Sequence, residues 1–182
     1  MKDLSQPEGW AAEESVKVIG PKGSLQRVRI LGPTRTRTQI EVSKTDTFVL
    51  GLEAPVRPSG MLENTPWVTL RGPAGELKTD GLIIAARHIH MHTKDAKAMQ
   101  LADGDYVDVQ LGDGKRAVLF TNTQVRVKDS YATEMHIDTD EANAAGISIR
   151  TDGTLILNDQ KKCGNIVGRL SMDLSSHDQE AL

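Results

Sequence analysis

Short segments of alternating apolar residues, each ended by a glycine-containing turn, recur through most of this 182-residue chain. Two of the turns have the form Gly-Pro-x-Gly, at 20–23 and 72–75, and each follows a segment rich in β-branched residues. Glycine and proline favour tight turns between strands. Strands at spacings of roughly 8–12 residues, with few helix-length patterns, favour small barrels over a parallel sheet with crossover helices. We therefore expect a mainly β fold of two small β-barrel domains with short capping helices.

The length agrees with two domains of roughly 70–90 residues each. We expect an N-terminal connecting segment at 1–14, a first barrel at 15–85 and a second barrel at 86–157. The remaining residues, 158–182, are expected to form a C-terminal tail whose last part is mobile.

Composition excludes several classes of function. The net charge is −3, and two Trp, two Tyr and two Phe are too few to build stacking platforms for single-stranded nucleic acid. The longest apolar runs, such as Leu82–Ala86, are too short to cross a membrane, and the N-terminus lacks a signal-peptide pattern. The single cysteine, Cys163, rules out an internal disulfide framework and fits a reducing compartment. We expect a cytoplasmic protein that binds neither nucleic acid nor membranes.

A His-x-His pair points to metal chemistry. His88 and His90 lie in the segment 82–91, whose isoleucine-rich sequence predicts a strand. Their side chains, two residues apart, therefore project from the same face. His136 lies in a second strand-like segment, 134–138. Imidazoles at this spacing suit a transition metal, most plausibly zinc. The alternative is that the pair forms only the polar face of an exposed strand.

Three segments repeat one pattern, in which a residue able to bind metal is followed closely by a helix start. The metal-competent residues are Glu41, His90 and His136. Threonine and aspartate favour helix N-termini, and these ends also attract anions. The three helix starts are predicted at Thr45 and Asp46, at Thr93 and Asp95, and at Thr139 and Asp140. The repetition strengthens the metal-site interpretation.

Three imidazoles around zinc leave a fourth position open, as in catalytic sites, where the ion polarises a carbonyl or binds an anion. Glu41 is a candidate ligand for a second ion or a group that orients a ligand; the alternative is an exposed strand carboxylate. Arg35 and Arg37 precede it, and a guanidinium matches phosphate geometry. For these arginines the alternative is a solvated strand face.

The other reactive side chains have weaker cases. His92 stands where a helix is expected to begin, and we interpret it as solvent-facing or as a neighbour of the ligands. His177 lies in the tail and is expected to be inert. Cys163 has no histidine near it in sequence, which argues against an acyl-accepting nucleophile.

Several motifs, in order along residues 2–157, resemble one known family, the PduL-type phosphate propanoyltransferases. The motifs that carry the resemblance are 2–7, 11–14, 32–35, 39–43, 85–91 and 134–143. The resemblance implies two β-barrel domains with two zinc ions between them. It also implies an enzyme that interconverts acyl-CoA and phosphate with acyl phosphate and CoA.

The resemblance also implies roles for individual residues. His88, His90 and His136 match the ligands of one zinc ion, and Glu41 matches the carboxylate ligand of the other. Arg35 matches a phosphate-binding arginine. Contacts with CoA are implied for Lys22, Arg29 and Asn143.

The chain departs from the family pattern in one respect. The family carries an earlier His-x-His segment before the motif at 2–7, and here Met1 directly precedes that motif. We therefore expect one complete three-His zinc site, in a chain that is either a truncated version of a longer protein or has lost part of the site. The alternatives to an acyltransferase are a zinc-dependent hydrolase and an inactive remnant that binds CoA and zinc.

The expected partners are acyl-CoA, CoA and phosphate. The resemblance leaves open a homo-oligomer, and also association with a bacterial microcompartment shell in propanediol degradation. The sequence gives no acyl-chain preference beyond the propanoyl group or a similar short chain.

Overall fold

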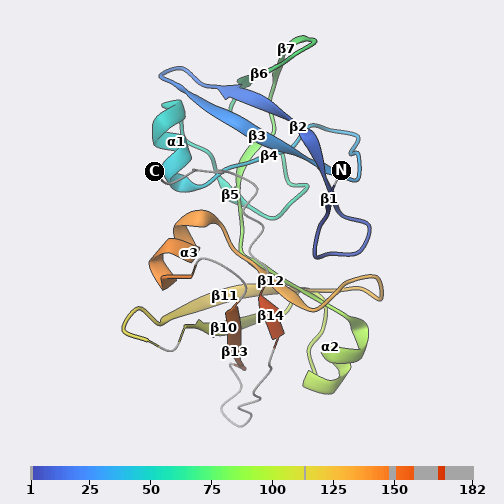
Figure 1. Cartoon of the computed structure of the whole chain (residues 1–182). Helices are drawn as coiled ribbons and strands as arrows, with labels where there is room; N and C mark the ends of the chain where they lie inside the picture. The colour runs from blue at the N-terminus through green and yellow to red at the C-terminus, as the bar shows by residue number, and fades with distance from the viewer. Residues whose placement is uncertain (1, 113, 148–150, 158–167, 171–182) are drawn as a thin grey trace. The chain divides into compact units, whose positions relative to one another are not determined.

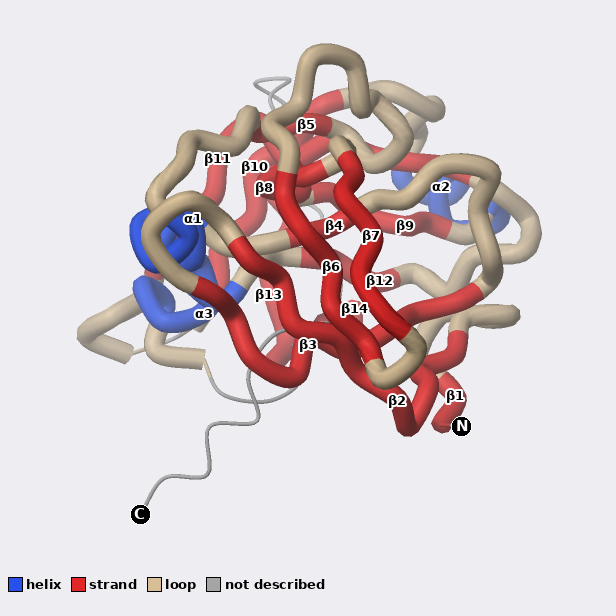
Figure 2. Tube along the Cα trace, turned by 90° about the horizontal axis from the view of Figure 1, so that it is seen from above, coloured by secondary structure: helices blue, strands red, loops and turns tan. Residues whose placement is uncertain are grey.

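The computed structural model describes residues 2–112, 114–147, 151–157 and 168–170. The described chain is mainly β, with three short helices (Figures 1 and 2). It divides into two compact units. The first holds residues 2–4 and Glu8–Ala86, and the second holds Ser5–Pro7 and the described residues from Arg87 onward. The segment 1–14 therefore contributes to both units, and it includes a short strand and the start of a long one.

The larger sheet of the first unit is antiparallel throughout. Its order is β1-β2-β6-β7, and β3 pairs with the other edge of β2. Both Gly-Pro-x-Gly turns connect antiparallel neighbours, β2 to β3 and β6 to β7, as the sequence predicts. The strands are β1 (Lys2–Asp3), β2 (Trp10–Ile19), β3 (Ser24–Gly32), β6 (Val68–Gly72) and β7 (Gly75–Thr79).

A second sheet in this unit is parallel, with the order β4-β8-β5. Its strands are β4 (Ile40–Glu41), β5 (Val56–Arg57) and β8 (Leu82–Ala85). The central strand β8 buries Leu82, Ile83 and Ile84 in succession, because a strand covered on both faces has no polar side. Leu82 and Ile84 belong to the same apolar cluster as Val18 and Leu50.

The helix α1 (Lys44–Leu50) has clear start and stop signals. Ser43 and Asp46 form a capping box, and Gly51 adopts a left-handed conformation with φ of 72° after the last turn. Leu50 is fully buried, and its carbonyl accepts a 3.0 Å hydrogen bond from the Lys22 amide. Gly20 is needed beside this contact, because a Cβ there would collide with the Leu50 carbonyl oxygen.

The second unit is built on one six-stranded sheet with the order β12-β9-β11-β10-β13-β14. Among the described pairings of this six-stranded sheet, β9–β11 is parallel and the other four are antiparallel. The two end strands, β12 and β14, lie close to each other, so the sheet curls into a half-barrel. Its strands are β9 (His88–Met91), β10 (Tyr106–Leu111), β11 (Val118–Val127), β12 (Glu134–His136), β13 (Thr151–Ile156) and β14 (Gly168–Leu170).

Two helices follow metal-competent residues in this unit, α2 (Thr93–Met99) and α3 (Thr139–Ala145). With α1 they confirm the three predicted helices, but the N-caps stand earlier than the predicted Thr and Asp pairs. The side chains of Ser43, His92 and Asp138 accept the free amide hydrogens of the first turns. Each cap therefore follows its strand by only one or two residues.

The prediction of one strand over 82–91 is wrong. Strand β8 ends at Ala85 and β9 begins at His88. The boundary between the two compact units falls between Ala86 and Arg87, so the chain leaves one sheet before it enters the next. Apolar residues lie on both sides of Ala86 and Arg87 and conceal the break in the sequence, although β8 buries three residues in succession and β9 only alternate ones.

The described pairings give a mainly β architecture with open sheets and one half-barrel. In the region expected as a tail, the structure describes only the strand β14, and Cys163 and His177 lie outside the described residues. None of the helices in the described ranges has the length and apolar character that a membrane span requires.

Candidate metal centre

Cross-strand register brings six polar residues together on one face of the second unit's sheet. Strand β9 lies between β12 and β11, and its residues pair with both. The residues between the polar ones, Ile89, Val125 and Met135, are buried in the core on the opposite face. The polar face therefore has two rows, His136–His88–Gln124 and Glu134–His90–Arg126.

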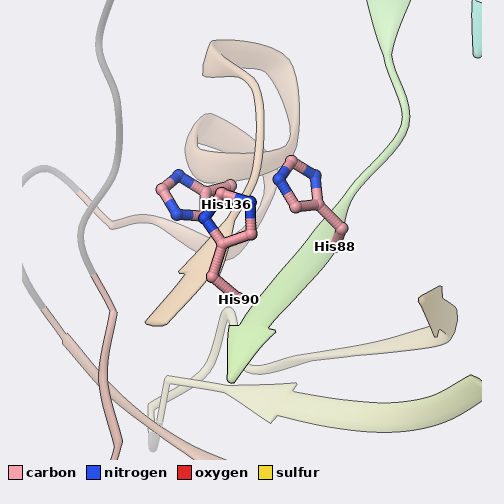
Figure 3. A group of neighbouring side chains, drawn as sticks. All are labelled: His88, His90 and His136. Carbon is pink, nitrogen blue, oxygen red and sulfur yellow. The ribbon is translucent and has the colours of Figure 1, made fainter. Parts of the chain in front are cut away.

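The three imidazoles converge as the sequence predicts. One ring nitrogen from each of His88, His90 and His136 lies within 4.8 Å of the others. The ring centroids are 4.7 Å apart for His88 and His90, 5.1 Å for His88 and His136, and 4.6 Å for His90 and His136. Figure 3 shows two rings rising from β9 and the third from the neighbouring β12. Such a cluster can hold a metal ion.

The electrostatics of the cluster suit a metal. Burial is the main cause that lowers the pKa of His90 and of His136 from 6.5 to about 3, and the positive charges of neighbouring groups add to it. Both rings are therefore neutral near pH 7, and neutral imidazole is the form that binds metals. His90 Nδ1 and His136 Nε2 are buried and have no hydrogen-bond partner among the described residues. A metal ion would satisfy such nitrogens, whose isolation is otherwise costly.

Two residues beside the cluster support it, and the sequence analysis missed both. Glu134 is only 6% exposed, and its Oε2 lies 3.7 Å from His136 Nε2. The Tyr131 ring stacks on His90 with a centroid separation of 4.1 Å and an angle of 22° between the planes. Strand alternation alone would have placed Glu134 on the same face as His136, two residues away. For Tyr131, in the loop before β12, no such signal exists.

The N-terminal segment Ser5–Pro7 anchors Glu134. Ser5 Oγ donates a 2.6 Å hydrogen bond to Glu134 Oε2, and Gln6 Nε2 donates one of 2.9 Å to the same atom. Gln6 also exchanges two hydrogen bonds with the backbone of Ala132, at 3.0 and 3.2 Å. These four bonds hold the carboxylate in one orientation next to the histidines.

His92 does not join the cluster. Its Nδ1 accepts a 3.0 Å hydrogen bond from the Lys94 amide and thereby caps α2. The side chain is half-buried. His92 therefore acts as the N-cap of α2, a role that the interpretation as a solvent-facing residue or a neighbour of the ligands did not include.

Arg87, which directly precedes His88, links the start of β9 to two neighbouring segments. It forms an ion pair with Glu141 on α3 and donates to the Thr121 carbonyl from Nε at 3.2 Å and from Nη2 at 3.1 Å. Burial raises the pKa of Glu141, and Arg87 opposes that shift. The pair ties the start of β9 to the helix that follows β12.

The predicted phosphate and second-metal residues belong to the first unit. Arg35 lies in the exposed loop between β3 and β4, and Glu41 ends β4 with its carboxylate bound by the Gln39 amide. Arg37 instead forms an ion pair with Asp80 at 3.1 Å. Arg37 is therefore already engaged within the fold.

The residues predicted to contact CoA lie in three different elements. Lys22 is exposed in the turn between β2 and β3, and Arg29 is half-buried on β3 opposite Ser15. Asn143 is exposed on α3, and its carbonyl accepts a 3.1 Å hydrogen bond from Arg116 Nη2. Their roles toward CoA stay predictions.

Comparison with known proteins places this arrangement in a family. The model of the phosphate propanoyltransferase family matches residues 1–148. The chain belongs to that family. Phosphate propanoyltransferases are acyltransferases, and the matched region contains the three histidines and every other residue singled out above as a candidate ligand or substrate contact.

Individual family members are similar over most of this chain. A phosphate propanoyltransferase from Thermotoga maritima is 51% identical over 146 residues, which cover 80% of this chain and 70% of that protein. One from Rhodopseudomonas palustris is 50% identical over 144 residues, covering 79% and 63% of the two chains. One from Limosilactobacillus reuteri is 43% identical over 150 residues, covering 82% and 70%.

Proposed function

We propose that this protein is a zinc-dependent phosphate acyltransferase. It converts a short-chain acyl-CoA, such as propanoyl-CoA, and phosphate into acyl phosphate and CoA, and it catalyses the reverse reaction. One observation carries the proposal: three half-buried imidazoles converge on one point, two of them held neutral, in a chain of the phosphate propanoyltransferase family.

His88, His90 and His136 would hold the zinc ion, and Glu134 and Tyr131 would keep two of these rings in place. When bound, zinc supplies a positive charge at an open coordination position, where it can offset negative charge on a substrate oxygen. The chain contributes a preorganised set of neutral ligands on a rigid sheet. A site of this kind needs little rearrangement when the substrate arrives.

The transfer step requires no side-chain nucleophile. A phosphate oxygen attacks the thioester carbonyl carbon, a carbon–oxygen bond forms, and the carbon–sulfur bond breaks to release CoA as a thiolate. Arg35 orients the phosphate, because its guanidinium offers paired donors to two oxygens. Lys22, Arg29 and Asn143 contact CoA, and Glu41 contributes to a second zinc site.

The finer structural and cellular features belong to the same proposal. Each unit is a small domain built on β-sheets, with the domains at 15–85 and 86–157. The protein acts in the cytoplasm of a bacterium. Measurement of its mass in solution would test for a homo-oligomer, and co-purification with shell proteins would test for association with a microcompartment.

The test compares acyl-CoA cleavage with and without phosphate. The proposal expects phosphate-dependent release of CoA, equal in amount to the acyl phosphate formed. In the variant His88→Ala, zinc content and activity should fall together, because a three-imidazole site loses one ligand. CoA release that needs no phosphate would instead indicate a zinc hydrolase. Bound CoA and zinc without turnover would indicate a binding remnant.

A further inference from the structure

Arg126 occupies an unusual position beside the three histidines. It lies on β11 opposite His90 on β9, in the row that ends with Glu134 on β12. Its side chain is half-buried. Strand alternation puts it on the polar face, because its neighbour Val125 is fully buried in the core.

Within the described part of the chain, the Arg126 guanidinium has no hydrogen-bond or ion-pair partner. Other arginines of the two units are engaged: Arg37 with Asp80, Arg57 with the Glu63 carbonyl, Arg71 with Glu76, Arg87 with Glu141, and Arg116 with the carbonyls of α3. The nearest acid in its row, Glu134, is already bound by Ser5 and Gln6. Among the residues that the structure describes, none therefore supplies an anion to Arg126.

The charge of Arg126 reaches the cluster. It is one of the causes that lower the pKa of both His90 and His136. A guanidinium carries five donors and stays protonated. A metal dication held by the histidines would repel the Arg126 guanidinium. An anion bound between the two positive charges would offset this repulsion.

We propose that Arg126 binds a phosphate group of the substrate beside the three-His cluster. Gln124, its neighbour two residues earlier on the same face, offers an amide donor next to His88. This inference rests on the proposed function, and it assigns to the second unit an oxyanion site of its own. Inorganic phosphate and the phosphate groups of CoA share the required chemistry, and the experiment separates them.

The experiment measures KM for phosphate, KM for CoA and zinc content in the wild type, Arg126→Ala and Arg126→Lys. The matched control is Arg71→Ala, which removes an exposed arginine from the β6–β7 hairpin. In Arg126→Ala one of the two KM values should rise by about tenfold or more, because charge-assisted hydrogen bonds are lost. Zinc content should stay at the wild-type level, and Arg126→Lys should recover part of the loss.

The substrate whose KM rises identifies the bound group. A rise for phosphate assigns the phosphate nucleophile to Arg126, and a rise for CoA assigns a phosphate of the coenzyme. Unchanged KM values for both, or a loss of activity that only follows a loss of zinc, would overturn the inference.

A binding measurement separates this inference from the proposed function. Calorimetric titration of the zinc-loaded protein with inorganic phosphate, and separately with CoA, requires no turnover. Binding of either ligand that Arg126→Ala weakens would support the oxyanion site even if acyl transfer were absent. Equal affinities in the wild type and Arg126→Ala for both ligands would contradict it while leaving acyl transfer intact.

Discussion

Glu134 Oε2 lies 3.7 Å from His136 Nε2 on the same strand face, and the carboxylate is held there by Ser5 and Gln6. A carboxylate this close to the ring nitrogen that is open to a metal ion places negative charge where the ion would bind, and so favours its binding. The segment Ser5–Pro7 thus supports a histidine that is far away in sequence. This relationship leads to the first two predictions.

Glu134→Gln should weaken zinc binding by about 10–100-fold, because the variant keeps the side-chain size but removes the negative charge beside His136. Competition with a chromophoric chelator measures the affinity. Glu76→Gln in the exposed β6–β7 hairpin is the matched control and should bind zinc as the wild type does. Equal affinities for all three proteins would remove Glu134 from the metal centre.

The double variant Ser5→Ala, Gln6→Ala should lose about 1–3 kcal/mol of unfolding free energy, since it leaves a buried carboxylate with fewer donors. Urea denaturation checks this value, and chelator competition should show weaker zinc binding as well. Gln26→Ala is a control at an exposed residue whose side chain donates a hydrogen bond to nearby Ser24. If the double variant kept full zinc affinity, Ser5–Pro7 would be a tether alone.

The stability of the zinc-free protein should decrease as the pH falls below about 6.5. In the folded state the pKa of His136 is about 3, whereas in the unfolded chain it is near 6.5. Between these values the unfolded state binds more protons, so acid favours unfolding by up to about 1.4 kcal/mol per pH unit for this one residue. Urea denaturation in EDTA from pH 7 to 5 measures the slope, and His136→Gln should flatten it. A slope that His136→Gln leaves unchanged would refute this assignment.

His92→Ala should keep zinc but destabilise the fold by about 1 kcal/mol, because it removes the N-cap of α2. Thermal denaturation and metal analysis test the two effects separately. The variant is a matched comparison for His88→Ala, since both remove one half-buried imidazole from neighbouring positions. Loss of zinc in His92→Ala would mean that this histidine also acts as a ligand.

Arg35→Ala should raise KM for phosphate by about tenfold or more and change the unfolding free energy little, because Arg35 lies in an exposed loop. Arg37→Ala is the comparison: it breaks the ion pair with Asp80 and should leave phosphate kinetics unchanged. Steady-state kinetics at varied phosphate concentration measure both. An unaltered KM in Arg35→Ala would show that phosphate binds elsewhere.

Local patterns in the sequence were enough for several features. The two Gly-Pro-x-Gly motifs predicted turns after strands, because their conformational preferences act over four residues, and both turns connect paired strands. The pairing of His88 with His90 followed from strand alternation. The helices were predicted, but their starts were placed too late in the sequence. The N-caps are Ser43 and Asp138, which accept hydrogen bonds from amides of the first turn.

Features that depend on contacts between distant segments were not accessible in this way. The break between β8 and β9 lies between two apolar segments, and it is defined by the different sheets that the two strands join. The bonds from Ser5 and Gln6 to Glu134 join positions that are 129 and 128 residues apart, and no local preference encodes them. The stacking of Tyr131 on His90 likewise requires a loop to fold back on β9.

The sequence by itself determined that the chain is mainly β, that it resembles the phosphate propanoyltransferases and that His88, His90 and His136 are candidate ligands. Only the tertiary structure decided what surrounds these imidazoles. The parallel pairing of β9 with β11 put Arg126 next to His90, and the antiparallel pairing with β12 put Glu134 on its other side. The reason is physical: alternation specifies the face of a strand on which a side chain lies, whereas strand order and register specify its neighbours.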